Sequence, residues 1–324
     1  MQCYLFVHFR ETTTPDGEQV YFSLSRDAFT WESLNNGQPV LWAYYGDHGV
    51  RDMTVVRDEE RGQIHIFATD LSLSYGMRGK YNHSWKNITE HGSKNLAHWV
   101  SKDLVHWSEE EMISVCDNTF GCVWAPDVLR DKNRGEYLLH WSSPRKEEGK
   151  SSMAIWFSRT RDFATWTKPE LLYSKEDAGV IDSAMYEEDG KTYLFVKSDT
   201  NPERVIMLSA DRPTGPFSRV KAFDRAMQDV AEGNYEAPTA VRLEDGRWCL
   251  FLDYFGVSGA GQGYVPFVAS SLENADFVRS DQAFFFPFGF KHGTILPISE
   301  EEYERMKLFD WKDVPDGRWR VNCK

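Results

Sequence analysis

The chain has 324 residues, of which 41% are apolar and 27% are charged. These proportions exclude a disordered or collagen-like chain, and no apolar run approaches the roughly 20 residues that a membrane-spanning helix needs. The net charge of −13 argues against nucleic acid as a partner, because a protein that binds a polyphosphate needs a basic face. Aromatic residues make up 15% of the chain, an excess that suits β-strands and surfaces that bind sugars.

The cysteine pattern bears on the compartment. Five cysteines are scattered along the chain without a C-x-x-C pair, which argues against a disulfide framework and a zinc site. The chain opens MQCYLFVHF, without the basic segment and long apolar run of a signal peptide. Both features predict a cytoplasmic location. The alternative is a secreted or periplasmic protein whose leader has been removed. No feature of the sequence indicates an oligomeric state.

A short motif recurs along the chain, in which a serine is followed by an acidic residue and then by an aromatic residue. A strand-like run precedes each copy, so each copy predicts a strand, a turn and an outer strand. The five copies are SRDAFTW (25–31), SKDLVHW (101–107), SRTRDFATW (158–166), SADRPTGPF (209–217) and SSLENADF (270–277).

A second pattern lies between these copies. A polar residue stands near the head of an apolar run, and in four cases a glycine turn and another strand-like run follow. The five polar residues are Asp52, Asp127, Asp182, Glu236 and His292. Five units of about 55 residues, each with about four short strands, predict an all-β, five-bladed β-propeller.

The two ends of the chain complement each other in this scheme. The opening runs CYLFVHF and QVYFSLS have no inner strand before them, whereas KHGTILPI (291–298) has no outer strands after it. We therefore predict that the N-terminal strands join the last inner strand and close the ring, which removes open sheet edges. Residues 1–324 then form a single propeller domain. The segment at about 299–311 predicts a short C-terminal helix with an acidic first turn.

Four of the five inner-strand residues are acids: Asp52, Asp127, Asp182 and Glu236. We expect them to keep the same phase in every blade and to line one central cavity. Clustered carboxylates cost free energy through repulsion and desolvation, which suggests that the molecule uses them. Glycoside hydrolysis needs such a set, because one carboxyl protonates the leaving group and another activates water, about 6.5–9.5 Å apart in inverting enzymes.

The motifs VRD (50–52), WAPD (124–127), VIDSAMYEEDGKTYL (180–194) and YEAPT (235–239), in register over nearly the whole chain, resemble glycoside hydrolase family 43. Members of that family are five-bladed propellers that act on arabinofuranosides, xylosides and related sugars. The resemblance implies that Asp52 is the general base and Glu236 the general acid. It also implies that Asp182 orients that acid and modulates its pKa. Met53 and Ser183 depart from the family, which commonly has Pro in the first position and Pro or Ala in the second.

Further residues are expected at the substrate. In the family, the WAPD motif lies outside the essential trio. The candidates for substrate binding are Arg51, Trp85, Trp124, Asp127, Tyr254 and His292. The alternative for Trp124 is burial in the core. The resemblance also implies that His292 helps to hold a hydrated, structural calcium ion in the central channel through water. No cofactor is expected for the chemistry itself.

The first unit is about 20 residues longer than the others, and the excess lies within residues 70–99. A long insertion beside an active site often forms a wall or a lid. Tyr75, Trp85 and His91 in this segment are therefore candidates for closing the pocket and making the enzyme exo-acting. The alternative is a solvated loop that packs its own aromatic residues.

The leading hypothesis is an inverting exo-glycosidase that removes a terminal pentofuranose, above all α-L-arabinofuranose, from plant-type oligosaccharides or polysaccharides. The lack of a C-terminal β-sandwich favours this activity over that of the family's larger xylosidases. The alternatives on the same fold are a β-D-xylosidase, a β-D-galactofuranosidase and an endo-arabinanase. A retaining fructan hydrolase is disfavoured because its Asn-Asp-Pro-Asn motif is absent. The alternative of a different class is a non-catalytic propeller that binds glycans.

Overall fold

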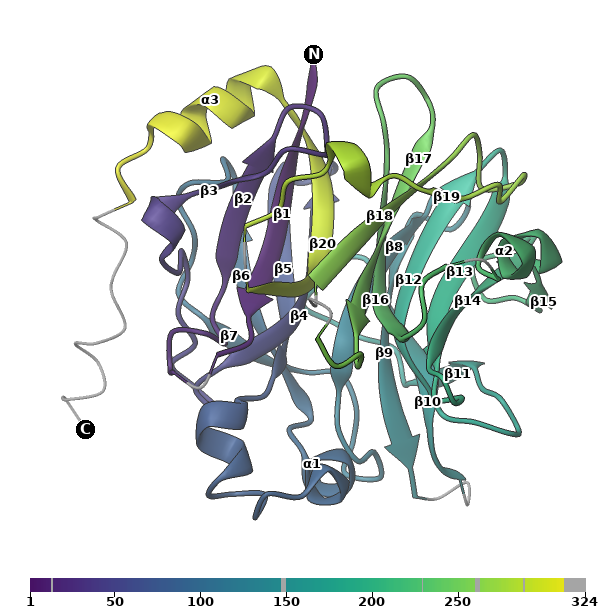
Figure 1. The fold of residues 1–324 in the computed structure, drawn as a ribbon. Coiled ribbons are helices and arrows are strands. Elements are labelled where there is room, and N and C mark those ends of the chain that lie inside the picture. Colours follow the sequence, from purple (N-terminus) through teal and green to yellow (C-terminus); the bar gives the residue numbers. More distant parts are fainter. Residues whose placement is uncertain (13, 147–149, 229, 260–262, 288, 312–324) are drawn as a thin grey trace. The chain divides into compact units, whose positions relative to one another are not determined.

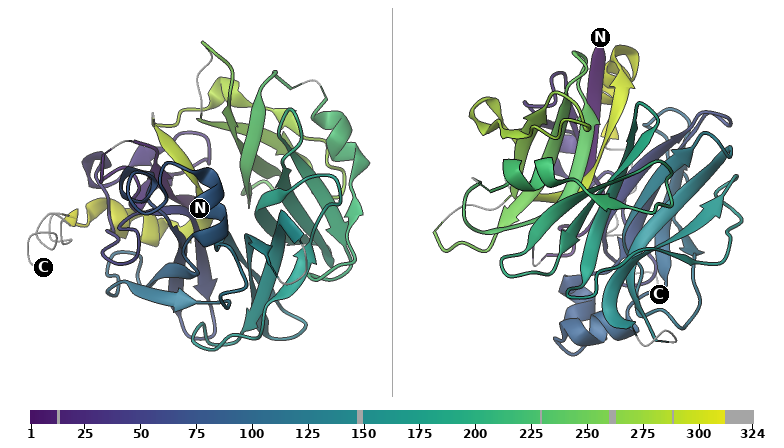
Figure 2. Two further views of the ribbon diagram at one scale, coloured as in Figure 1. Left: turned by 90° about the horizontal axis from the view of Figure 1, so that it is seen from below. Right: turned by 90° about the vertical axis from the view of Figure 1, so that its right-hand side faces the viewer.

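The computed structural model describes residues 1–12, 14–146, 150–228, 230–259, 263–287 and 289–311. It contains five four-stranded antiparallel sheets, which confirms the predicted five-bladed β-propeller (Figure 1). Each sheet is small and twisted (Figure 2), and in four of the five sheets the strands follow one another along the chain. Two compact units can be separated, one with residues 1–117, 121–123 and the chain from 285 onward, the other with 118–120 and 124–284. Among the described residues, no helix is long and apolar enough to cross a membrane.

One sheet of the first unit joins the two ends of the chain. Its strands, in the order β20-β1-β2-β3, are β20 (Phe290–Ser299), β1 (Gln2–Arg10), β2 (Tyr21–Ser25) and β3 (Glu32–Ser33). The 3-10 helix η1 (Asn35–Gly37) follows β3. Strand β1 runs antiparallel to β20 with Leu5 opposite Leu296. The predicted closure by the N-terminal strands is therefore confirmed.

The other sheet of the first unit carries the insertion. Its strands are β4 (Val50–Asp58), β5 (Gln63–Asp70), β6 (Asn95–Ser101) and β7 (Glu111–Ser114). The insertion between β5 and β6 forms the π-helix η2 (Leu73–Met77) and the helix α1 (Trp85–His91) (Figure 1). Helix α1 begins after Ser84, whose hydroxyl accepts a hydrogen bond from the backbone N–H of Asn87 and so satisfies a free donor of the first turn.

The second unit holds the remaining three sheets, each formed by consecutive strands. They are β8 (Trp124–Asp131), β9 (Glu136–Arg145), β10 (Lys150–Thr160) and β11 (Glu170–Tyr173); β12 (Val180–Glu188), β13 (Lys191–Ser198), β14 (Arg204–Ala210) and β15 (Ser218–Arg219); and β16 (Asn234–Arg242), β17 (Trp248–Phe255), β18 (Gly263–Ala269) and β19 (Val278–Arg279). Helix α2 (Lys221–Ala226) contacts β14, and the 3-10 helix η3 (Asp281–Ala283) follows β19.

The cores lie between the sheets of each unit. In the first unit, Leu24, Ile66 and Trp99 belong to one buried apolar cluster. In the second, Phe195 and Leu250 belong to another. The middle strands are buried along nearly their whole length, because sheets that are covered on both faces bury the side chains of both faces. The buried strands thus provide rigid support for the polar residues at the heads of the inner strands.

The recurring serine–acid motif builds the turn between the third and fourth strands of a blade. In the first copy, Ser25 Oγ accepts a hydrogen bond from the backbone N–H of Ala28, and Asp27 Oδ1 accepts one from that of Thr30. In the third copy the capping hydroxyl belongs to Thr160. The motif there begins two residues after Ser158, the residue with which the sequence comparison began it. In these copies the motif therefore encodes a turn capped by its own side chains.

Helix α3 (Glu300–Leu308) lies inside the predicted range of about 299–311. It begins at a capping box, in which Ser299 accepts from the backbone N–H of Glu302 and Glu302 accepts from that of Ser299. It ends at Phe309, whose backbone is extended. The predicted domain also covers 312–324, which lie outside the described residues.

Candidate functional site

Every inner strand has a β-bulge near its head, where two of its residues oppose one residue of the neighbouring strand. The bulged pairs are 52–53 in β4, 125–126 in β8, 182–183 in β12, 237–238 in β16 and 291–292 in β20. Four of these pairs begin with a residue of positive φ. A bulge bends the strand and changes the direction of the side chains around it. The polar residues singled out in the sequence therefore lie in or next to five bulges.

The expectation that the four acids keep one phase is wrong. Asp52 and Asp182 are the first residues of their bulges, Glu236 directly precedes its bulge, and Asp127 directly follows its own. Each step along a strand turns the side chain to the opposite face, and an extra residue shifts that alternation. The acids thus occupy three different positions relative to the bulge. This allows them to have different roles.

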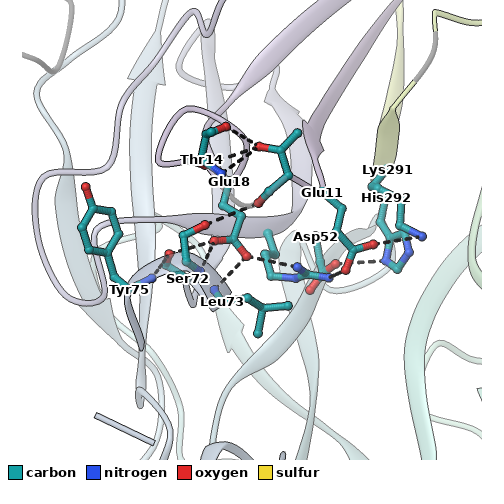
Figure 3. Close-up of polar contacts among 12 residues, drawn as sticks. Glu11, Thr14, Glu18, Asp52, Ser72, Leu73, Tyr75, Lys291 and His292 are labelled. Atoms are coloured by element: carbon teal, nitrogen blue, oxygen red, sulfur yellow. Dashed lines mark hydrogen bonds and ion pairs between the residues drawn. The ribbon is translucent and has the colours of Figure 1, made fainter. Parts of the chain in front are cut away.

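Asp52 in the first unit contacts the imidazole of His292. The Nδ1 atom of His292 lies 3.1 Å from Oδ1 of Asp52, and both side chains point toward each other from β20 and β4 (Figure 3). His292 is buried and Asp52 is half-buried. The ring therefore holds one oxygen of this carboxylate in place.

Arg51 is fixed by acids of the protein. Its Nη1 lies 3.2 Å from Oε1 of Glu18, and its Nη2 lies 3.5 Å from Oε1 of Glu11. Burial alone would lower the pKa of Arg51, but the charges of Asp52, Glu11 and Glu18 hold that pKa above its ordinary value. Substrate binding was expected of Arg51. That role stays a prediction, and in the structure Glu11 and Glu18 hold the guanidinium group.

The second unit holds Asp182 and Glu236. Oδ2 of Asp182 accepts a hydrogen bond of 3.3 Å from the backbone N–H of Ala237, which directly follows Glu236. The N–H of Asp182 donates in turn to Ser142 Oγ at 3.1 Å, and Tyr264 donates to the carbonyl oxygen of Ala237 at 3.2 Å. Asp182 thus positions the backbone that carries Glu236.

Lys197 was not singled out in the sequence, yet it contacts Glu236 directly. Its Nζ lies 3.1 Å from Oε2 of Glu236 and 2.7 Å from Oε2 of Glu203. Burial alone would lower the pKa of Lys197, but the charges of Asp182, Glu236 and Glu203 raise it well above its usual range. The signal available in the sequence was a lysine within the otherwise apolar run TYLFVKS, because a buried lysine needs an acidic partner.

Asp127 braces two blades of the second unit. Its Oδ2 accepts a hydrogen bond of 3.0 Å from the backbone N–H of Met185 and lies 3.6 Å from Nε2 of His140. The equivalent N–H in β16, that of Ala240, donates to the hydroxyl of Tyr186. A substrate contact was expected of Asp127. The observed contacts place its carboxylate between β8 and β12.

Ser183, which departs from the family's proline or alanine, has a partner that explains it. Its Oγ lies 2.7 Å from Nδ1 of His140, and both side chains are buried. Burial lowers the pKa of His140 to about 3, so the ring is neutral at physiological pH. A proline or alanine at this position would leave the buried ring nitrogen without this hydrogen bond.

The aromatic candidates lie in different settings. Trp85 begins α1 and is 54% exposed, and Tyr75 in η2 is 44% exposed. His91, the last residue of α1, is exposed. Trp124 begins β8 and is only half-buried. The hydroxyl of Tyr254 donates to the carbonyl oxygen of Glu232 at 2.7 Å, so the proton of this hydroxyl already has an acceptor within the protein.

The first unit fits a calcium ion only through water. Calcium takes six to eight oxygen ligands, whereas Asp52 offers one carboxylate there and His292 offers a ring whose Nδ1 already contacts it. Lys291 lies close by, with its Nζ 3.5 Å from Oε2 of Glu11, and its positive charge opposes a second cation. Water would have to supply most of the ligands.

Comparison with known proteins adds a family match. Residues 1–304 match the model of a family related to glycoside hydrolase family 43 and described as "Probable glycosyl hydrolase domain". An alpha-L-arabinofuranosidase of Bifidobacterium longum subsp. longum is 28% identical over a region covering 58% of this chain. The matched region spans only 19% of that protein.

Two solved structures share the fold. A mutant of the family-43 protein BlXynB from Bacillus licheniformis is 12% identical, with a TM-score of 0.60 over 90% of this chain and 54% of the other. An endo-1,4-beta-xylanase from Bacteroides thetaiotaomicron is 14% identical, with a TM-score of 0.57 over 82% of this chain and 85% of the other.

Proposed function

Because the chain belongs to the family of glycosyl hydrolase domains related to glycoside hydrolase family 43, and is therefore a glycoside hydrolase, we propose that it removes terminal α-L-arabinofuranose from oligosaccharides with inversion of configuration. In this proposal Glu236 is the general acid, Asp52 the general base and Asp182 the residue that positions the acid. The observation that carries it is the hydrogen bond from the backbone N–H of Ala237 to Asp182.

Each carboxyl group has surroundings that suit its role. Glu236 donates its proton to the leaving oxygen, and the fixed peptide behind it keeps its side chain in one direction. Asp52 takes a proton from the attacking water, and the ring of His292 at 3.1 Å orients the carboxylate for that transfer. Lys197 adds a positive charge beside Glu236, which stabilises the carboxylate after the proton has left.

The choice of sugar rests on the partial similarity to the Bifidobacterium enzyme. The test is the release of nitrophenol from aryl α-L-arabinofuranoside, β-D-xylopyranoside and β-D-galactofuranoside. We expect release from the arabinofuranoside. Release from one of the other two substrates alone would assign that sugar to the enzyme instead. No release from any of the three, together with cleavage of linear arabinan, would indicate an endo-arabinanase. Affinity for glycans without turnover of any substrate would favour the non-catalytic propeller.

The catalytic assignment is tested by Glu236→Gln and Asp52→Asn. Both variants should keep the melting temperature within a few degrees of wild type and lose at least about a thousandfold in kcat, because each removes a proton-transfer group. Asp177→Asn is the control, since that carboxylate is 75% exposed. Near-wild-type turnover in either active-site variant would refute the assignment of that residue.

Inversion and calcium need separate measurements. Proton NMR during hydrolysis should show the β-anomer of arabinose as the first product, whereas the α-anomer would indicate a retaining mechanism.

We include a hydrated calcium ion near His292 in the proposal. Metal analysis of the purified protein should find about one calcium per chain, and its loss from His292→Ala would support this location. Absence of calcium from the wild type would remove the ion from the proposal.

A further inference from the structure

The first unit contains exposed aromatic side chains on two segments that precede and follow the first inner hairpin. Tyr45 and His48 lie in the turn before β4, and Tyr75 lies in η2 after β5. The rings of His48 and Tyr75 approach each other edge to face, with 6.1 Å between their centroids. Tyr45 is 42% exposed and Tyr75 is 44% exposed. Two exposed tyrosines and His48 thus come from two separate segments, and the contact between the His48 and Tyr75 rings joins these segments at the surface, which distinguishes them from a singly exposed ring.

Buried acids hold the turn before β4. Oε2 of Glu110 accepts hydrogen bonds from the backbone N–H groups of Tyr44 and Tyr45, at 2.5 and 3.2 Å. Oδ1 of Asp70 accepts a bond of 2.7 Å from the N–H of Asp47. The Asp47 carboxylate lies 2.7 Å from Nζ of Lys80, which belongs to the insertion. The turn and the insertion are therefore linked by an ion pair between the buried Asp47 and the exposed Lys80.

Glu18 holds the start of the insertion. Its two oxygens accept hydrogen bonds from Ser72 Oγ and the backbone N–H groups of Leu73 and Ser74, at 2.8 to 3.1 Å (Figure 3). Ser72 Oγ in turn accepts a bond of 3.1 Å from the N–H of Tyr75. Glu18 is only 1% exposed. The backbone that carries Tyr75 is therefore fixed by a buried carboxylate.

Two glycines let the segments interlock. Gly46 has a φ of +59°, and a Cβ there would meet the carboxylate of Asp70. A Cβ on Gly49 would lie 2.7 Å from Cβ of Ser72. The missing side chains thus bring the turn and the insertion into direct contact. The backbone segments that carry the aromatic rings are thus tied to each other, so less conformational entropy is lost when a ligand binds to them.

The turn before β4 and the insertion are connected to β4, the strand that carries Asp52. The N–H of Val50, at the head of β4, donates to the carbonyl oxygen of Glu18 at 2.8 Å, and the carboxylate of Glu18 also contacts Arg51. Tyr75 and the proposed base are therefore connected through Glu18 and its contacts within the first unit (Figure 3).

We propose that Tyr75, with His48 and Tyr45, binds a sugar ring of the substrate other than the one that is released, an inference that rests on the proposed function. A sugar ring presents a face of C–H groups that packs on an aromatic ring and a rim of hydroxyls that suits His48 and the tyrosine hydroxyls. The net charge of −13 disfavours an anionic ligand. A neutral glycan is therefore the occupant that fits.

The test compares two substrates in the same enzyme. The ratio of kcat/KM for α-1,5-linked arabinotriose to kcat/KM for aryl α-L-arabinofuranoside isolates binding beyond the reacting sugar. Tyr75→Ala should lower this ratio on the order of tenfold, mainly through KM for the trisaccharide. Tyr75→Phe keeps the ring and should recover most of the loss. Phe285→Ala removes a ring that is 63% exposed elsewhere in the unit and should leave the ratio unchanged.

Calorimetric titration with arabinotriose and xylotriose separates this inference from the proposed function. Binding that weakens about tenfold in Tyr75→Ala, without turnover by the wild type, would support the site and refute the catalytic proposal. Turnover with an unchanged ratio and unchanged affinity in Tyr75→Ala would refute the site alone. A wild type that binds neither trisaccharide and cleaves only the aryl glycoside would also refute it.

Discussion

The ammonium group of Lys197 lies 3.1 Å from Oε2 of Glu236, the carboxyl proposed to protonate the leaving group. A positive charge at this distance favours the ionised form of a carboxyl, whereas a general acid must begin each cycle protonated. Lys197 also contacts Glu203, so its charge is shared between two acids. The position of Lys197 therefore sets a balance between donating the proton and stabilising the carboxylate that results.

Lys197→Met should move the alkaline limb of the pH dependence of kcat/KM to higher pH, by about one to two units. Without the ammonium charge, Glu236 keeps its proton to higher pH. Lys197→Arg retains the charge and should stay near the wild-type profile. Lys191→Met, on the same strand but exposed and paired with Glu273, is the matched control. An unmoved alkaline limb in Lys197→Met would show that this charge does not act on the acid.

The sequence was sufficient to predict the five blades, but not to predict where each acid stands relative to the bulge of its strand. The repeating turn motif and the unmatched strands at the two ends predicted five sheets and their closure, since both depend on local patterns. The bulges at Asp52 and Asp182 depend on how many residues oppose them on a neighbouring strand, and a single strand carries no such information. Lys197 was missed for a related reason, because its partner Glu236 comes from a different blade.

Asp127→Ala should destabilise the protein by about 1–3 kcal/mol, because it leaves the buried N–H of Met185 without an acceptor. Asp127→Asn retains an acceptor oxygen and should cost much less. Urea unfolding of both variants, with Asp177→Ala as the exposed control, measures this difference. If Asp127 instead bound substrate, Asp127→Asn would raise KM on aryl arabinofuranoside at unchanged stability.

Glu18→Gln should be strongly destabilising, by about 2–4 kcal/mol, because the amide nitrogen cannot accept from the donors that surround this buried side chain. Those donors include Arg51, Ser72 and Leu73. Glu11→Gln is the control in the same network. The Glu11 side chain is 37% exposed, so its loss should cost less than about 1 kcal/mol. Equal unfolding free energies for the two variants would contradict the role given to Glu18.

Glu110 should make stability depend on pH. Burial is the main reason that its pKa is raised to about 7 from the ordinary value of 4.5. Between these two values the folded state holds a proton that the unfolded state has released, so stability falls as pH rises from about 4.5 to about 7. The loss is on the order of 2–3 kcal/mol.

Glu110→Gln removes this titrating group, so the variant should lose less stability than wild type between pH 4.5 and pH 7.5. Urea unfolding of both proteins at the two pH values measures the difference. The amide oxygen of glutamine can still accept the two bonds from Tyr44 and Tyr45, which makes the variant a conservative one. Identical pH dependence in the two proteins would mean that Glu110 is already ionised in the folded state well below pH 7, and that the two backbone donors outweigh its burial.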